Sequence, residues 1–314
     1  MVEIAPGLEG CLSGNLSGGP DSTFAGEVEA STQNSRDKRG DAVKKLISSL
    51  VLFVLCAVVP SRAQLAAPNP VGVGMGHVHL HVKDVELETK FWTALGGSPM
   101  KVGAFEVMKF PGTLVFVSTP AQPEPGGPSE GSAVNHIGFQ VPNVQESVAK
   151  WKAAGLKVVP GNRPQQAFVF TPDDVKIEIL EDQSLTVPIA FHHIHFYVAD
   201  SDTGADQVKE IQAWYAKMFG AKPGMRGPNQ AADVPGVNLT FTKSPTPTAA
   251  TKGRTLDHIG FEVKDLEAFC KKLEANGVKL DRPYQKAPIA GLSLAFLSDP
   301  WGTSIELNEG LDKL

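Results

Sequence analysis

GHVHLHVKD, at residues 76–84, is the first of four related stretches in this chain of 314 residues. The others are NHIGFQVPN at 135–143, HHIHFYVAD at 192–200 and DHIGFEVKD at 257–265. Each copy has histidine at its second position and Asp or Asn at its ninth. All eight histidines of the chain lie inside these stretches, at positions 77, 79, 81, 136, 192, 193, 195 and 258. Structural histidines would be scattered, so this concentration predicts a metal site built from a repeated strand.

Each stretch alternates between apolar and polar residues. In the fourth copy, Ile259, Phe261 and Val263 alternate with His258 and Glu262. This period of two predicts a β-strand with one apolar face. We expect the apolar face to be covered by a helix and the histidine face to look into the space that the sheet encloses.

A helix is predicted after each strand, because apolar residues recur there at intervals of three or four. Each helix is expected to end near a glycine, which readily adopts the left-handed conformation, at position 96, 155, 220 or 277. Two or three short strands follow each helix. The chain is therefore predicted to be an α+β protein made of four βαβββ units.

The last strand of each half carries a glutamate. VKIEILED contains Glu178 and follows the tight turn TPDD at 171–174, whereas TSIELNEG contains Glu306 and follows DPWG at 299–302. Matching the halves gives two predicted metal-ligand sets, namely His77, His136 and Glu178, and His193, His258 and Glu306. Two imidazoles and one carboxylate leave several coordination positions of a divalent ion open.

Other residues on the histidine faces are candidates for proton transfer or substrate contact, with a packing role as the alternative. They are His79, His195, Tyr197 and Glu262. Three loop residues are weaker candidates for holding an anionic substrate: Arg163, Arg282 and Tyr284. No role is predicted for His81 or His192.

The N-terminal region resembles a targeting segment rather than part of the fold. Residues 43–63 combine two lysines, an apolar run and small residues before Gln64, which predicts a signal peptide and an extracytoplasmic protein, periplasmic or secreted. No stable membrane anchor is expected after cleavage. Residues 1–42 then form a disordered tail or, if Val43 is the true start, an over-extended reading; the alternative is a genuine tail before an uncleaved anchor. Residues 64–75 are predicted to be a linker.

Composition limits the partners that this chain can have. The formal net charge is −5, and we find no basic cluster in the part expected to fold, which argues against nucleic acid as a partner. A small-molecule substrate is expected instead, and an oligomer is left open.

The unit pattern resembles the vicinal oxygen chelate superfamily, which includes glyoxalase I, extradiol dioxygenases, and fosfomycin- and bleomycin-resistance proteins. HIGFEVKD at 258–265 and DPWGTSIEL at 299–307 are typical of it. The resemblance covers about residues 76–310 and implies two domains, at 76–183 and 189–311, each with a curved mixed sheet that holds metal on its concave face. The units could also exchange partners between the halves.

The resemblance implies an enzyme that depends on Fe, Mn, Zn, Ni or Co and acts on a small substrate with vicinal oxygens. The reaction would be that of a lyase, an isomerase or an extradiol-type dioxygenase. The alternative is a binding protein of the bleomycin-resistance type without turnover. With both ligand sets complete, up to two ions per chain are expected, and no other cofactor.

The sequence departs from each branch of the family. Glyoxalase I has a fourth ligand, a Glu, on a strand that here reads GTLVFVSTP at 112–120 or GVNLTFTKSP at 236–245, without a carboxylate. Ring-cleaving dioxygenases have a Tyr near the final turn, where this chain has Phe296. Bleomycin-binding members generally lack the metal ligands.

Overall fold

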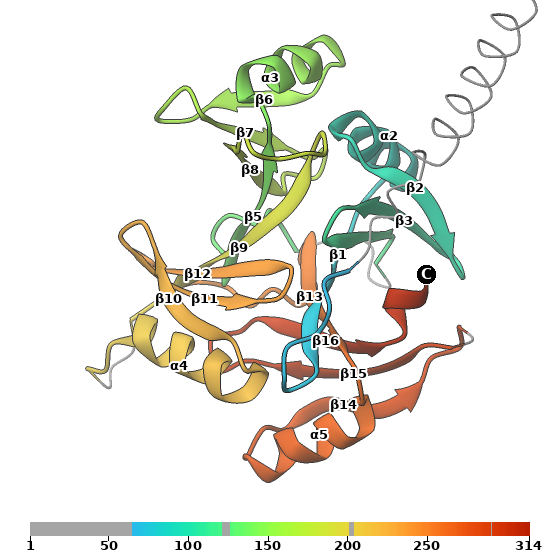
Figure 1. Ribbon diagram of the computed structural model, residues 1–314, viewed down its shortest axis with the longest axis vertical. Coiled ribbons are helices and arrows are strands. Elements are labelled where there is room, and N and C mark those ends of the chain that lie inside the picture. The colour runs from blue at the N-terminus through green and yellow to red at the C-terminus, as the bar shows by residue number, and fades with distance from the viewer. Residues whose placement is uncertain (1–64, 121–125, 201–203, 290) are drawn as a thin grey trace, which may run out of the picture. The chain divides into compact units, whose positions relative to one another are not determined.

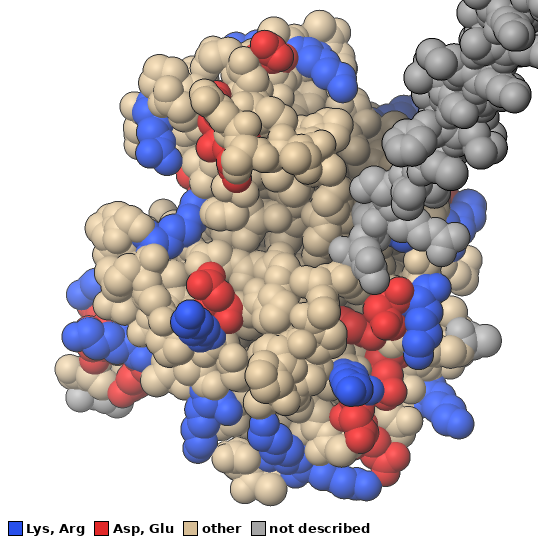
Figure 2. Space-filling model, viewed as in Figure 1, with Lys and Arg blue, Asp and Glu red and all other residues tan. Residues whose placement is uncertain are grey.

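The computed structural model describes residues 65–120, 126–200, 204–289 and 291–314, so residues 1–42 and the predicted signal peptide at 43–63 lie outside it (Figure 1). No helix in these described ranges is long and apolar enough to cross a membrane. Acidic and basic side chains lie interspersed on the face shown in Figure 2.

The four predicted units are all present. The first contains β1 (Val73–His81), α2 (Val85–Leu95), β2 (Ser98–Val102), β3 (Phe105–Phe110) and β4 (Thr113–Ser118). The second contains β5 (Val134–Val141), α3 (Val144–Ala153), β6 (Lys157–Pro160), β7 (Gln166–Phe170) and β8 (Lys176–Glu181). The third contains β9 (Ala190–Val198), α4 (Gln207–Phe219), β10 (Lys222–Arg226), β11 (Asn229–Val234) and β12 (Val237–Lys243). The fourth contains β13 (Leu256–Val263), α5 (Leu266–Ala275), β14 (Leu280–Lys286), β15 (Ser293–Ser298), β16 (Ser304–Glu309) and the short 3₁₀ helix η1 (Leu311–Lys313).

The units combine into two mixed sheets of eight strands, and the predicted α+β fold class is confirmed. Sheet I joins the first and fourth units in the order β14-β15-β16-β13-β1-β4-β3-β2. Sheet II joins the second and third units in the order β10-β11-β12-β9-β5-β8-β7-β6. At the centre of each sheet, two histidine-bearing strands pair antiparallel, β1 with β13 and β5 with β9.

The two sheets do not follow the expected division of the chain at 76–183 and 189–311. Each sheet takes one unit from either half, which is the exchanged arrangement that the sequence left open. The four histidine strands have nearly the same alternating pattern, so every pairing among them would bury the same face. The connections between the sheets run alongside each other, with a backbone N–H···O bond of 2.8 Å from Ala133 to Ala249.

The helices end near the predicted glycines, and three of the four begin at the Asp or Asn that closes the repeated stretch. Asp84, Asn143 and Asp265 cap three helices by accepting a hydrogen bond from a backbone N–H of the first turn. In the third unit this cap is Asp206 rather than Asp200, because the loop before α4 is longer. Glycines 96, 155, 220 and 277 all have positive φ at or just beyond the helix ends, as predicted.

Aromatic side chains pack between consecutive units and so link the two sheets. The ring centroid of Phe139 on β5 lies 4.9 Å from that of Phe110 on β3. In the other half, the ring of Phe219 on α4 lies 4.9 Å from that of Phe261 on β13. The hydrophobic core therefore joins first to second and third to fourth units, whereas the sheets join the other pairs.

The tight turns predicted at 171–174 and 299–302 receive polar contacts from the helix of the preceding unit. The Tyr215 hydroxyl on α4 donates to Asp299 Oδ2 at 2.9 Å. On α2, Glu88 accepts from the Asp173 backbone N–H at 3.3 Å and from Trp92 Nε1 at 3.0 Å. Each sequence half is thus held together by its core and by a polar contact, which is buried in the second half and partly buried in the first.

The buried Glu88 should make stability depend on pH. Burial raises the pKa of its carboxyl from 4.5 to about 7. Between these values the unfolded chain loses the proton while the native chain keeps it, so the free energy of unfolding falls as pH rises. Glu88→Gln should reduce that fall by about 3 kcal/mol between pH 4.5 and 7.5, as measured by urea denaturation.

The exposed Glu86 on the same helix provides the control. Glu86→Gln should leave the pH dependence of the wild type in place. An unchanged slope in Glu88→Gln would show that Glu88 is ionised in the native protein at neutral pH.

Candidate metal centres

The register of the central strands brings histidines from two units together in each sheet. In sheet I, His77 lies opposite Gly260 and His79 opposite His258, while Glu306 on β16 lies beside Gly260. In sheet II, His193 lies opposite Gly138 and His195 opposite His136. Glu178 on β8 lies beside Gly138. The two resulting clusters are site I (His77, His79, His258 and Glu306) and site II (His136, Glu178, His193 and His195).

The glycine of the HIG motif leaves room for the imidazole from the neighbouring strand. A Cβ atom at Gly260 would come within 2.0 Å of the His77 ring. A Cβ atom at Gly138 would come within 1.8 Å of the His193 ring. Any larger residue would push these rings away from the glutamate on the strand beyond.

In site I, three ligand-type atoms converge. His258 Nε2 lies 2.9 Å and His77 Nε2 3.3 Å from Glu306 Oε2. Within the cluster each residue offers one ligand atom, and these atoms lie within 4.8 Å of one another. This donor set, two imidazole nitrogens and a carboxylate, suits a divalent transition metal with open positions.

Further polar groups hold the ligands of site I in place. Asp257 Oδ1 lies 2.5 Å from His258 Nδ1. The Asn308 amide donates to Glu306 Oε1 at 2.8 Å. The fourth member, His79, uses Nε2 in a 2.8 Å hydrogen bond with Ser118 Oγ. A histidine ligand whose second nitrogen is paired with a carboxylate is typical of metal sites.

Burial and pairing set the charges at site I. Burial lowers the pKa of His77 and His79, so both imidazoles are neutral near pH 7. For His258, burial alone would lower the pKa, but its hydrogen bonds with Asp257 and Glu306 raise it to about 9. Burial likewise opposes ionisation of Glu306, but hydrogen bonds with His258 and His77 keep its pKa well below the usual range. Metal binding would therefore release a proton from His258.

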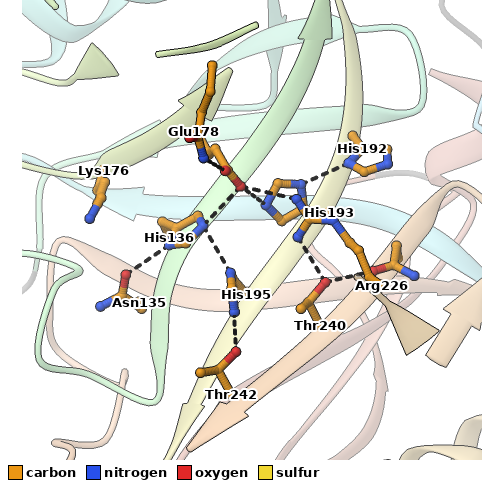
Figure 3. A network of polar contacts seen from close by, with 12 residues as sticks. Asn135, His136, Lys176, Glu178, His192, His193, His195, Arg226, Thr240 and Thr242 are labelled. Atoms are coloured by element: carbon orange, nitrogen blue, oxygen red, sulfur yellow. Dashed lines mark hydrogen bonds and ion pairs between the residues drawn. The ribbon is translucent and has the colours of Figure 1, made fainter. Parts of the chain in front are cut away.

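Site II has the same four residue types in the same arrangement (Figure 3). Its Glu178 Oε2 lies 2.9 Å from His193 Nε2 and 3.4 Å from His136 Nε2. His195 Nδ1 lies 3.2 Å from His136 Nε2, and its Nε2 lies 2.7 Å from Thr242 Oγ1. Burial lowers the pKa of His195 to about 3.

All six predicted metal ligands lie in the two clusters, but the predicted grouping is wrong. His77 lies with His258 and Glu306, not with His136 and Glu178. His193 correspondingly lies with His136 and Glu178. The cause is the exchange of units, which gives each site one histidine from either half of the chain.

The predicted proton-transfer residues divide among three places. His79 is in site I and His195 in site II, with the Tyr197 ring centroid 5.5 Å from that of His195. Glu262 lies in neither cluster. Its carboxylate accepts hydrogen bonds from the backbone N–H groups of Gly310 and Leu311, so the structure gives it a capping role and not the predicted catalytic one.

The remaining predicted candidates also separate. Arg282 lines the cavity above site I, whereas Arg163 and Tyr284 do not. His81 lines the same cavity, and its Nδ1 lies 3.3 Å from Asp257 Oδ2. His192 Nδ1 lies 2.9 Å from His193 Nδ1 in sheet II.

Sequence reasoning missed the residues that surround the ligands. Asp257 and Asn135 directly precede the metal-site histidines in DHIGF and NHIGF, so the motif itself contained this signal. Ser118 and Thr242 occupy equivalent positions at the ends of β4 and β12, where each bonds to a histidine. Their role depends on strand register, which the sequence did not specify.

Site I forms the floor of a cavity of about 830 Å³. Most of its lining is apolar, including Phe105, Phe116, Phe296, Ile289 and Leu294. Its charged side chains include Lys252, Asp281 and Arg282. A concave, mainly apolar space with a few polar groups is the usual form of a small-molecule site.

Comparison with known proteins agrees with this fold. Residues 190–307 match the model of the Glyoxalase/Bleomycin resistance protein/Dioxygenase superfamily. No curated protein matches the sequence. Glyoxalase I from Zea mays is similar in structure, with a TM-score of 0.59, 16% identity, and coverage of 77% of this chain and 94% of that one.

A second similar structure is a Bacillus subtilis protein described only provisionally as a dioxygenase. It has a TM-score of 0.57 and 15% identity, and the match covers 79% of this chain and 86% of that one. At these identities the structural matches show the fold. Together with the family match, they confirm the resemblance to the vicinal oxygen chelate superfamily.

The HIG glycines provide a direct test of site I. Gly260→Ala should displace the His77 ring and so weaken Zn²⁺ binding at site I. Loss of a group that only hydrogen-bonds to a ligand lowers metal affinity about 10- to 100-fold, and displacement of a ligand should cost more than that. Gly138→Ala displaces His193 instead and should leave ion binding at site I intact. Isothermal titration calorimetry of the two metal-free variants with Zn²⁺ measures the affinity of site I in each.

Both alanine variants add a methyl group where two strands are already in close contact, so the free energy of unfolding should fall by about 1–3 kcal/mol in each. Loss of stability alone therefore does not separate them, whereas affinity does. Equal Zn²⁺ affinity in Gly260→Ala and the wild type would contradict the assignment of His77 as a ligand.

Asp257 should act on the metal through His258. Asp257→Asn keeps the shape but removes the charge beside His258 Nδ1, so affinity at site I should fall about 10- to 100-fold. Asp281→Asn makes the same change elsewhere in the cavity lining, where the aspartate accepts from Ser298, and should leave affinity unchanged. Matching losses in both variants would indicate a general effect of cavity charge and not the Asp257–His258 contact.

Proposed function

We propose that this chain is a divalent-metal-dependent enzyme whose reaction takes place at site I, on a small and largely apolar molecule with two adjacent oxygens. The observation that carries the proposal is the convergence of His77, His258 and Glu306 at the floor of the 830 Å³ cavity. A bound ion there would act as a Lewis acid toward the adjacent oxygens of the substrate. The donor set fits such an ion and would leave coordination positions open for the substrate.

The cavity lining indicates the kind of molecule that would bind. The rings of Phe105, Phe116 and Phe296 would contact an apolar or aromatic body. Arg282 lies over the Phe296 ring, with its guanidinium carbon 5.5 Å from the ring centroid. An anionic group on the substrate would find Arg282 and Lys252 in the same lining.

His79 is the best-placed group for moving a proton. It faces the same cluster as the ligands, and its ring centroid lies 4.7 Å from that of His258. Burial and the neighbouring imidazoles lower its pKa, so it is a neutral base at pH 7. When its Nε2–H donates to Ser118, Nδ1 carries the basic lone pair. This favours a lyase or isomerase in which His79 would take a proton from the carbon beside the adjacent oxygens of the substrate.

The test is a screen of metal-loaded protein against catechols, 2-oxoaldehydes and their thiol adducts. The protein is stripped with a chelator and reloaded separately with Zn²⁺, Ni²⁺, Co²⁺, Mn²⁺ or, without air, Fe²⁺. His258→Ala should lose both the ion of site I and the activity. His79→Ala should keep the ion but lose about 10²- to 10⁴-fold in rate, whereas His192→Ala, outside both clusters, should be unaffected.

Other results would redirect the proposal. A rate that falls in His195→Ala and not in His79→Ala would move the reaction to site II. Turnover that requires dioxygen would indicate the oxygenase branch. A compound that binds tightly and is recovered unchanged, with none turned over, would indicate the binding protein.

A further inference from the structure

Sites I and II can be compared position by position, because the strands pair in equivalent registers. His77 and His79 of β1 lie beside Leu114 and Phe116 of β4, as His193 and His195 of β9 lie beside Asn238 and Thr240 of β12. On the other side, Phe296 pairs with Glu306, as Phe168 pairs with Glu178. Val102 and Arg226 each end the strand before the outer hairpin turn of their sheet.

At three matched positions, site II is the more positive of the two. Asn135 replaces Asp257 beside the ligand histidine. Lys176 occupies the β8 position that Ser304 has on β16, two residues before the glutamate. Arg226 replaces Val102. All three differences move the local charge in the direction that disfavours a divalent cation.

Arg226 is in direct contact with the carboxylate that would bind an ion (Figure 3). Its Nη2 donates to Glu178 Oε2 at 3.1 Å, the same oxygen that His193 and His136 face. Its Nη1 donates to Thr240 Oγ1 at 3.1 Å. The Gln166 amide donates to the other oxygen, Glu178 Oε1. Both oxygens of the carboxylate are therefore already bonded to groups outside the imidazoles.

The matched positions in site I cannot do this. Val102, Phe116 and Leu294 stand where site II has Arg226, Thr240 and Gln166. Leu294 and Phe116 line the cavity and offer no hydrogen bond to Glu306. The second oxygen of Glu306 accepts only the uncharged Asn308 amide among the contacts of the described chain.

We propose that Arg226 is a built-in cation that takes the place of the divalent ion at site II, so that the chain binds one ion, at site I. The guanidinium neutralises Glu178 and would lie against any ion held by His136 and His193. Site II has the same types of donor residue as site I, but the positive charge of Arg226 beside Glu178 does not fit a metal ion there. This replaces the two ions expected from the sequence, and it goes beyond the function proposed for site I.

Metal stoichiometry is the measurement that tests this. Purified full-length protein is stripped with a chelator, titrated with Zn²⁺ alone, and analysed by calorimetry and by elemental analysis after gel filtration. The wild type should bind one ion; His258→Ala should bind none, and His136→Ala should still bind one. Arg226→Met should bind two, and adding Asn135→Asp should tighten the second site.

Arg282→Met is the matched control, because it removes the same charge from the cavity of sheet I and should leave one ion bound. Thermal unfolding gives an independent readout. Zn²⁺ should raise the Tm of Arg226→Met more than that of the wild type, since two sites then bind only the native state.

Two ions in the wild type, one of them lost in His136→Ala, would overturn the proposal. A well-folded Arg226→Met that still binds one ion would also overturn it. If that variant does not fold, the His136→Ala and His258→Ala comparison decides the question alone. No ion in the wild type would contradict the function proposed for site I, yet an ion gained in Arg226→Met would still support the role of Arg226.

Discussion

The antiparallel pairing of β1 with β13, and of β5 with β9, is the constraint on which both sites depend. Each pairing sets a glycine directly opposite a histidine, so the ring crosses over the neighbouring strand toward the glutamate on the strand beyond. A shift of one of these strands by one residue would turn its histidines toward the helices and away from those of its partner. The same hydrogen bonds that assemble the sheets therefore assemble the ligand sets.

The units are tied together in two different ways. Strand pairing joins the first unit to the fourth and the second to the third, whereas aromatic packing joins the first to the second and the third to the fourth. Neither half of the chain can keep both kinds of contact without the other. Binding of an ion at site I would consequently be linked to the packing of both halves of the chain, because its candidate ligands come from both.

Much of this structure could be predicted from the sequence. The alternation in DHIGFEVKD predicted that Ile259, Phe261 and Val263 pack into the hydrophobic core while His258 faces the site, and the glycines near the helix ends all have the expected positive φ. The six predicted ligand residues lie in the two clusters, because the four histidines recur at one position of the repeat and the two glutamates lie on equivalent last strands. Their grouping could not be predicted, since GHVHLHVKD, NHIGFQVPN, HHIHFYVAD and DHIGFEVKD are equally suited to pair with one another.

Arg226 shows a second limit of sequence reasoning. It ends a short, mostly exposed strand far from any histidine motif, and a long side chain at an edge hairpin is usually a solvated charge. Only the fold shows that it reaches Glu178. The fold alone also shows where Glu262 lies. Its position in the alternating pattern places it on the histidine face of β13, but it lies too far along the strand to reach the cluster.

The two sites show how one framework can support different chemistry. Site I places its ligands under an apolar cavity, where a low local dielectric strengthens the field of a bound charge. Site II fills the matched positions with Thr240, Gln166 and Arg226, so its buried carboxylate is satisfied without a ligand. A buried ion pair of this kind contributes little net stability, but breaking it leaves an unpaired charge and is costly. Site II is thus held in its present form by its own polar contacts, and on our proposal site I is the one that would take a divalent ion from solution.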